Sequence, residues 1–184
     1  ALAAAVDERM AVQHEHSNAV ARYAGAIARR LGWSEADIGQ LRLAAMLHDV
    51  GKVRVPESIL RKPGPLDADE WAEIAKPPVV GAEIVARVEG LDAIGPWIRH
   101  SHERIDGAGY PDGLAGDEIP FASRILLVAD AFDAMTSDRS YRRALPHAEA
   151  IAELDRNAGT QFDAACVEAL KAELASTAPA SRAG

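Results

Sequence analysis

Apolar residues recur three or four residues apart along most of the chain, which is the spacing of an α-helix, and strand-like alternation is confined to 53–55. In the segment 14–31, Ile27 and Leu31 continue one apolar face, and Gly32 ends the pattern. The same spacing predicts further helices from Ser34 to His48, from Asp67 to the Pro77-Pro78 pair, and at 78–89, 93–104, 120–136, 146–157 and 163–175.

Capping and turn residues divide these segments without a break that would separate two domains. Asp67 is a residue type that caps helix N-termini, and Glu70 follows three residues later, as in a capping box. Residues 51–65 are rich in Pro and Gly and predict a loop. We therefore predict an all-α, single-domain helical bundle over residues 1–175, with a frayed tail at 176–184 that lacks apolar periodicity.

Composition narrows the class of protein. No apolar run approaches the roughly 18 residues of a membrane span, and nothing resembles a secretion signal, so we expect a cytoplasmic domain. Because the sequence does not begin with Met, we expect a piece of a longer protein. The single cysteine, Cys166, suits a reducing compartment and lies among apolar neighbours that predict a buried, inert thiol. A net charge of -8 argues against DNA or RNA as a partner but permits one small phosphate ligand.

The densest chemical signal is the stretch LHDVGK, residues 47–52. An apolar helix ends there in His48 and Asp49, an imidazole and a carboxylate that suit a divalent metal ion. Gly51 permits a turn, and Lys52 places a cation where a phosphate bound to such a metal would lie. The alternative is that His48 caps the negative end of its helix and Asp49 is loop surface.

Two further elements supply matching side chains. Asp130 interrupts an otherwise apolar helix, where an unpaired carboxylate would be costly to bury, and Asp133 follows on the same face. His16 contributes a second imidazole from the first long helix. A salt bridge would explain one of these carboxylates, whereas a metal site explains the whole set. The set that resembles the metal ligands of the HD superfamily of phosphohydrolases comprises His16, His48, Asp49 and Asp130.

A longer motif narrows the resemblance. Residues 102–120, HERIDGAGYPDGLAGDEIP, are similar to the HD-GYP family pattern HHExxDGxGYP. The similarity continues in HDVGKVRVPESILRKPGPLDADEW, SRILLVADAFDAMTSDRSYRRAL and AGTQFDAACVEAL. These motifs occur in the family's order and cover residues 12–173. The chain therefore resembles an HD-GYP domain over nearly its whole length, with an ordered GYP loop.

The resemblance implies a bacterial, all-helical, metal-dependent phosphodiesterase that opens cyclic di-GMP to the linear dinucleotide, with iron or manganese as cofactor. It implies catalytic roles for Asp49 and Lys52. It also implies that Tyr110 shapes the substrate pocket and that Lys52, Arg139 and Arg142 contact phosphate. The alternative for the arginines is a solvated basic patch.

The chain departs from the family at positions that matter for metal binding. Ser101 stands where the family has a histidine before His102, and Pro77 replaces another ligand histidine. Val12 replaces the glutamate of members with three metals. We therefore expect one tight site held by His16, His48, Asp49 and Asp130, a weak or absent second site using His102 and Asp49, and no third site. His100 is the remaining candidate to restore the second site.

Three functions remain open on the sequence alone. The first is a cyclic di-GMP phosphodiesterase of reduced activity with a compromised second metal site. The second is a degenerate module that binds nucleotide or protein, for example diguanylate cyclase domains, and the third is a one-metal HD phosphohydrolase acting on nucleotides. The GYP loop favours the first two, because general nucleotidases lack it. A homodimer is compatible with the sequence.

Overall fold

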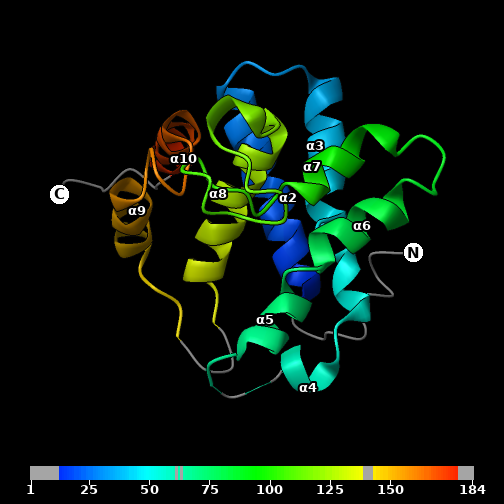
Figure 1. Ribbon diagram of the computed structural model, residues 1–184. Helices are drawn as coiled ribbons and strands as arrows, with labels where there is room; N and C mark the ends of the chain where they lie inside the picture. Colours follow the sequence, from blue (N-terminus) through cyan, green and yellow to red (C-terminus); the bar gives the residue numbers. More distant parts are fainter. Residues whose placement is uncertain (1–12, 61, 63, 139–142, 178–184) are drawn as a thin grey trace.

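The computed structural model describes residues 13–60, 62, 64–138 and 143–177, and these form helices and loops without a β-strand (Figure 1). The only bridge among them is the isolated pair Ala158 and Phe162. This confirms the predicted all-α class. The elements are α2 (Gln13–Arg30), α3 (Glu35–Leu47), η1 (Val50–Arg54), α4 (Glu57–Leu60), α5 (Ala68–Ile74), α6 (Pro77–Val85), η2 (Asp92–Ile94), α7 (Gly95–Arg99), η3 (Gly116–Glu118), α8 (Phe121–Thr136), α9 (His147–Arg156) and α10 (Ala164–Thr177).

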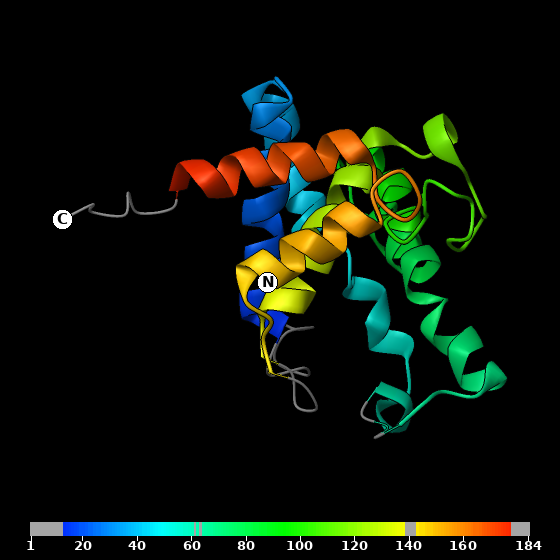
Figure 2. The same cartoon turned by 90° about the vertical axis from the view of Figure 1, so that its left-hand side faces the viewer.

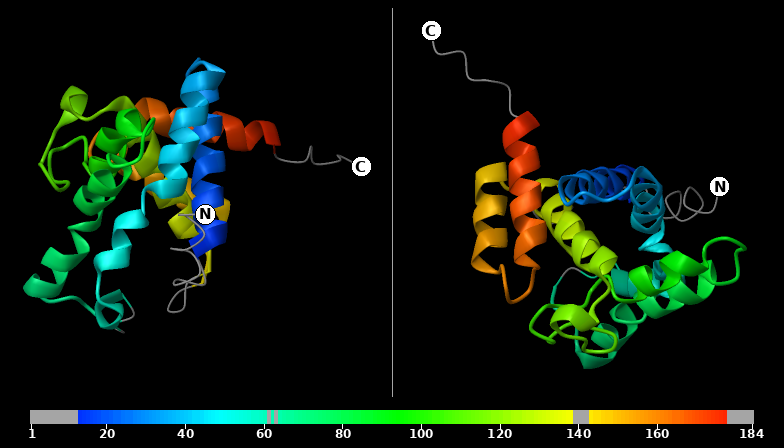
Figure 3. Two further views of the ribbon diagram at one scale, coloured as in Figure 1. Left: turned by 90° about the vertical axis from the view of Figure 1, so that its right-hand side faces the viewer. Right: turned by 90° about the horizontal axis from the view of Figure 1, so that it is seen from above.

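Helices α2 and α8 pack against each other at the centre of the bundle. Helix α3 covers one side of α2, and α10 contacts both central helices. Helices α9 and α10 form an antiparallel hairpin beside α8, as Figures 2 and 3 show. On the other side α6 packs against η1 and α7, so the short turn after α3 is fixed between two parts of the bundle.

The core consists of apolar side chains from the central helices and their neighbours. Ile27, Leu41, Phe132 and Leu170 come from four different helices and are fully buried. Each such side chain contributes roughly 1.5–3 kcal/mol through its burial. Cys166 is also buried, as predicted, and burial holds the pKa of its thiol well above the usual range. No described helix has the length and apolar character to cross a membrane.

Several predicted boundaries hold and others move. The Ser34 side chain accepts a hydrogen bond from the backbone of Asp37, and Asp67 and Glu70 form the predicted capping box. Residues 51–65 are not a simple loop, because they contain the last four residues of η1 and all of α4. The helix predicted at 67–77 ends at Ile74, and the next begins at Pro77. Helix α10 continues to Thr177, two residues into the predicted tail, and 178–184 lie outside the described residues.

The largest difference concerns the predicted helix 93–104. Its α-helical part, α7, ends at Arg99, and the chain from His100 onward is irregular. The Ser101 hydroxyl donates to the Ile98 carbonyl, and the following Glu103 turns inward to hold the next loop. The α-helix therefore ends before a local bond of Ser101 and the long-range bonds of Glu103.

Candidate metal centre

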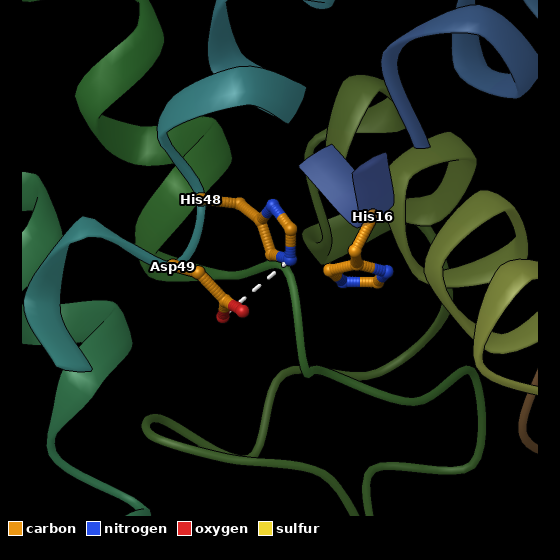
Figure 4. A group of neighbouring side chains, drawn as sticks. All are labelled: His16, His48 and Asp49. Atoms are coloured by element: carbon orange, nitrogen blue, oxygen red, sulfur yellow. Dashed lines mark ion pairs between the residues drawn. The ribbon is translucent and has the colours of Figure 1, made fainter. Parts of the chain in front are cut away.

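Four side chains predicted as metal ligands converge where α2, α3 and α8 meet. His16 lies near the start of α2, His48 and Asp49 follow the end of α3, and Asp130 lies within α8. One donor atom each of His16, His48 and Asp49 lie within 4.8 Å of one another (Figure 4). The Asp130 Oδ1 lies 3.2 Å from the His16 Nε2 and 4.0 Å from the His48 Nε2. The two imidazole nitrogens and an Asp49 oxygen thus form a compact set, and an Asp130 oxygen lies beside both imidazoles.

The orientation of each imidazole is fixed by a hydrogen bond at its Nδ1, the ring nitrogen that faces away from the cluster. The His16 Nδ1 donates to the Asp133 Oδ2 at 2.6 Å, and the His48 Nδ1 donates to the Ala45 carbonyl oxygen at 2.6 Å. In a neutral ring, a proton on Nδ1 leaves the lone pair of Nε2 available. Metal-binding histidines in proteins are usually supported in this way by a carboxylate or a backbone carbonyl. Asp133 and the end of α3 therefore point both Nε2 atoms at the carboxylates.

The electrostatics of the cluster favour a cation. Burial opposes the charged form of Asp49 and Asp130, but the neighbouring His48, Lys52 and His16 outweigh it and hold both carboxyl pKa values well below their usual range. Burial alone would lower the pKa of His16, but its hydrogen bonds to Asp130 and Asp133 raise that pKa to about 9. The carboxylates therefore carry negative charge that a divalent ion would balance. A set of two nitrogens and two oxygens fits a transition metal such as iron or manganese.

Lys52 lies beside this cluster with its ammonium 2.6 Å from the Asp49 Oδ2. Its side chain is half-buried and lines a cavity of about 460 Å³ next to His16 and Asp130. This volume lies within the range of small-molecule sites in proteins. The predicted phosphate-contacting cation therefore borders both the candidate metal ligands and an open space. The predicted contacts Arg139 and Arg142, and Val12, lie outside the described residues.

His102 and Tyr110 lie on another side of the centre. Their rings stack with centroids 5.1 Å apart, and Trp71 meets the Tyr110 ring edge-on at 5.9 Å. Burial lowers the pKa of His102, although Asp130 and Asp49 act in the opposite direction. Burial, with the same two carboxylates, raises the pKa of Tyr110 to about 12. The structure thus brings both predicted residues near the cluster, with His102 favoured as a neutral imidazole.

The GYP loop, residues 105–116, is held by a buried glutamate whose role the sequence did not reveal. Glu103 is 1% exposed and accepts hydrogen bonds from three backbone amides of the loop. Its Oε1 accepts from Asp112 at 2.7 Å and Gly113 at 3.1 Å, and its Oε2 accepts from Leu114 at 3.1 Å. Gly109 is required where the loop returns, because a Cβ there would lie 2.4 Å from the Arg104 nitrogen.

The same loop is docked on the turn between α9 and α10. The amide of Asp106 donates to the Thr160 carbonyl at 2.8 Å, and the amide of Ile105 donates to the Gln161 carbonyl at 3.4 Å. These bonds join segments about 55 residues apart in the sequence, so no local pattern predicts them. The loop and the α9–α10 turn consequently form one connected wall near the centre.

The three positions that bear on a second metal are engaged elsewhere. Ser101 is 3% exposed, and its hydroxyl donates to the Ile98 carbonyl. Pro77 is buried at the first position of α6, and its carbonyl abuts Gly51, where a Cβ would lie only 2.0 Å from the Pro77 oxygen. The His100 Nε2 lies 3.0 Å from the Asp112 Oδ2, on the GYP loop. This contact engages one ring nitrogen of His100, while its Nδ1 is buried without a hydrogen-bond partner among the described residues.

The chain is similar to known proteins over most of its length. The model of the HD domain family matches residues 2–166. The chain is 40% identical over 169 residues to 3'3'-cGAMP-specific phosphodiesterase 3 of Vibrio cholerae. The aligned region covers 92% of this chain and 37% of that protein. It is 41% identical over 172 residues to the cyclic di-GMP phosphodiesterase response regulator RpfG of Xanthomonas campestris, covering 92% of this chain and 45% of that protein.

A solved structure gives the same result at the level of the fold. A crystal structure of a cyclic GMP-AMP specific phosphodiesterase of V. cholerae superposes with a TM-score of 0.60 and 36% identity, over 94% of this chain and 39% of that one. The chain therefore spans less than half the length of these relatives.

Proposed function

The chain belongs to the HD domain family, and from this premise we propose that it is a metal-dependent phosphodiesterase that hydrolyses cyclic di-GMP. The observation that carries the proposal is the cluster of His16, His48 and Asp49, with Asp130 beside both histidines and Lys52 beside Asp49, at a cavity of about 460 Å³. The relatives named above are phosphodiesterases of cyclic di-GMP and of 3'3'-cGAMP, which supports a cyclic dinucleotide as the substrate.

In this proposal His16, His48, Asp49 and Asp130 hold one divalent ion, iron or manganese. When bound, such an ion lowers the pKa of a water molecule and withdraws electron density from a phosphate. Lys52 supplies a positive charge to a phosphate oxygen through a charge-assisted hydrogen bond. Its contact with Asp49 keeps the ammonium beside the ligand set in the absence of substrate.

Other residues of the chain orient the metal ligands and enclose the candidate site. Asp133 holds the proton on the His16 Nδ1, so the ring presents its lone pair to the ion. Glu103 holds the GYP loop in place, and the loop keeps Tyr110 stacked on His102 near the centre. Arg139 and Arg142 are proposed as further phosphate contacts on the basis of the family resemblance.

The proposal is tested with protein purified without added metal. We expect one equivalent of Mn²⁺ to bind tightly in calorimetry, and a manganese- or iron-loaded sample to convert cyclic di-GMP to the linear dinucleotide on a nucleotide-separating column. Lys52→Met should bind Mn²⁺ but lose most of this hydrolysis. Failure of either metal to bind, or hydrolysis that does not depend on metal, would contradict the proposal.

A second candidate, a degenerate module that binds nucleotide or protein without turnover, is favoured by two observations. The Ser101 hydroxyl is used by the Ile98 carbonyl, and the buried Pro77 has no side-chain donor atom. Partners such as diguanylate cyclase domains, and a homodimer, remain predictions for this case.

Restoring both imidazoles separates the two candidates. Pro77→His together with Ser101→His should add a second bound metal, using His102 and Asp49, and should raise the rate of hydrolysis. Each single change should do little, because the ligands of one metal act as a unit. Pro77 stands at the first position of α6, where a backbone N–H needs no helical partner, so the substitution is compatible with the helix. If the parent protein hydrolyses cyclic di-GMP as fast as the double variant, the two missing histidines do not limit the rate of hydrolysis.

A further inference from the structure

The cavity beside the candidate metal centre extends to the turn between α9 and α10. Its lining includes His16, Lys52 and Asp130. Its lining also includes three polar side chains from α9 and the turn after it that have no part in the candidate metal centre, namely Glu153, Asn157 and Gln161. A phosphate beside Lys52 would direct the rest of a nucleotide along this space. The polar side chains of α9 and the turn after it therefore border the space that a base would enter.

Two of these polar groups have hydrogen-bonding capacity to spare. Within the part of the chain that the structure describes, the Gln161 side-chain amide makes no hydrogen bond. The Asn157 Nδ2 donates to the backbone carbonyl and to the Oε1 of Glu153, both at 2.9 Å, which orients its Oδ1 and leaves that oxygen without a donor among the same residues. Both side chains line the cavity, so a bound molecule can use them.

The turn that carries these side chains is rigidly built. Gly159 has a φ of +80°, and its amide donates to the Phe162 carbonyl at 2.8 Å, while the Phe162 amide returns a bond to the Asn157 carbonyl at 3.1 Å. The Thr160 carbonyl accepts from Asp106 of the GYP loop. Phe162 is buried and anchors the turn in the core. Polar groups held in this way favour one ligand geometry over others.

We propose that the α9–α10 turn reads a purine base of the substrate, with Gln161 and Asn157 as specificity-determining residues that favour guanine over adenine. This inference rests on the proposed function and names the part of the substrate that the cavity accepts. Guanine presents N1–H and N2–H donors beside the O6 acceptor. The Asn157 Oδ1 accepts from these donors together with the Glu153 carboxylate, whose oxygens also accept from Asn157 and Arg156, and the Gln161 amide donates to O6. Adenine reverses this order, because its N1 is an acceptor and its N6 a donor.

The experiment compares three cyclic dinucleotides and one diester without a base. We would measure kcat/KM for cyclic di-GMP, 3'3'-cGAMP, cyclic di-AMP and bis(p-nitrophenyl) phosphate with the manganese-loaded parent, Gln161→Leu and Gln161→Glu. We expect Gln161→Leu to lower the value for cyclic di-GMP about 10-fold, the order expected for one lost hydrogen bond of about 1.4 kcal/mol. Hydrolysis of bis(p-nitrophenyl) phosphate should not change.

Gln161→Glu provides the sharper result, because its carboxylate repels guanine O6 and accepts from adenine N6–H. The ratio of cyclic di-GMP to cyclic di-AMP turnover should therefore fall further than in Gln161→Leu. Gln40→Leu is the matched control, since Gln40 is exposed on α3 and does not line the cavity. An unchanged ratio in both Gln161 variants would overturn the inference. So would an equal loss for all four substrates, because that pattern indicates damage to the metal centre.

Failure of the proposed function has a different signature. If the metal-loaded parent hydrolyses no cyclic dinucleotide, the same variants are compared by calorimetric binding of cyclic di-GMP and cyclic di-AMP. A binding preference for cyclic di-GMP that Gln161→Glu reverses would support base reading without turnover. Absence of any preference in the parent, or of any binding, would overturn the inference as well.

Discussion

Glu103→Gln is the substitution that tests most directly how the GYP loop is held. The change preserves the size of the side chain but converts one carboxylate oxygen to an NH₂ group. In the parent, one oxygen accepts from Asp112 and Gly113 and the other from Leu114. If the amide oxygen keeps its two partners, the new NH₂ faces the Leu114 N–H, so two donors meet in a site that is 1% exposed.

The expected cost follows from these contacts. An unsatisfied buried donor costs about 1–3 kcal/mol, and a hydrogen bond to a charged acceptor is worth roughly 1 kcal/mol more than one to a neutral acceptor. One unpaired backbone donor and two weakened bonds together give a loss of about 3–5 kcal/mol. The loop can open locally instead of straining the whole domain, which limits the effect on the global free energy of unfolding.

The assay is amide hydrogen exchange at Asp112, Gly113 and Leu114, together with urea unfolding. We expect exchange at these amides to accelerate at least about 30-fold, the equivalent of 2 kcal/mol or more. The matched control is Glu118→Gln, because the Glu118 carboxylate accepts from one backbone amide, that of Ala115, at an exposed position. Its effect should stay below about 1 kcal/mol. Equal exchange rates in Glu103→Gln and the parent would refute the role given to Glu103.

Three further results are expected. Asp133→Asn should weaken Mn²⁺ binding about 10–100-fold in calorimetry, because the amide no longer fixes the proton on the His16 Nδ1, and unchanged affinity would remove Asp133 from the site. Gly51→Ala should destabilise the fold in urea by more than about 2 kcal/mol, since its Cβ would collide with the Pro77 carbonyl, whereas Gly39→Ala in open space on α3 should stabilise it by about 0.5–1 kcal/mol. Saturating Mn²⁺ at about 100 times its dissociation constant should add about 2.7 kcal/mol of stability, seen as a rise in Tm of roughly 5–10 °C, and no rise would indicate that the folded state binds no metal.

The sequence predicted the fold where local pattern and burial agree. Helices α2 and α8 have a continuous apolar face, and the structure buries that face around Ile27 and Phe132. The Asp67 cap was predictable because its hydrogen bond with Glu70 spans only three residues. The end of α7 was not predictable, because Glu103 turns inward for partners nine to eleven residues away, on a loop without periodicity.

The candidate site also contains residues that the sequence indicates and residues that only the packing of the helices reveals. A carboxylate such as Asp130 inside an apolar helix is visible in the sequence, because burying it needs a partner. The support that Asp133 gives to His16 joins residues 117 positions apart, and only the packing of α2 on α8 brings them together. Gln161 lies in the family-like stretch AGTQFDAACVEAL, but the sequence assigned it no role, because an amide in a polar turn is ordinary until the turn is seen to border a cavity.

The docking of the GYP loop on the α9–α10 turn also governs how this domain can be cut and recombined. Truncation after α8 would remove the carbonyls of Thr160 and Gln161 and leave the amides of Ile105 and Asp106 to water. It would also uncover the faces of α2 and α8 that α10 packs against. In chimeras between relatives, the loop and the α9–α10 hairpin should therefore be exchanged as one module, although about 30 residues separate them along the chain.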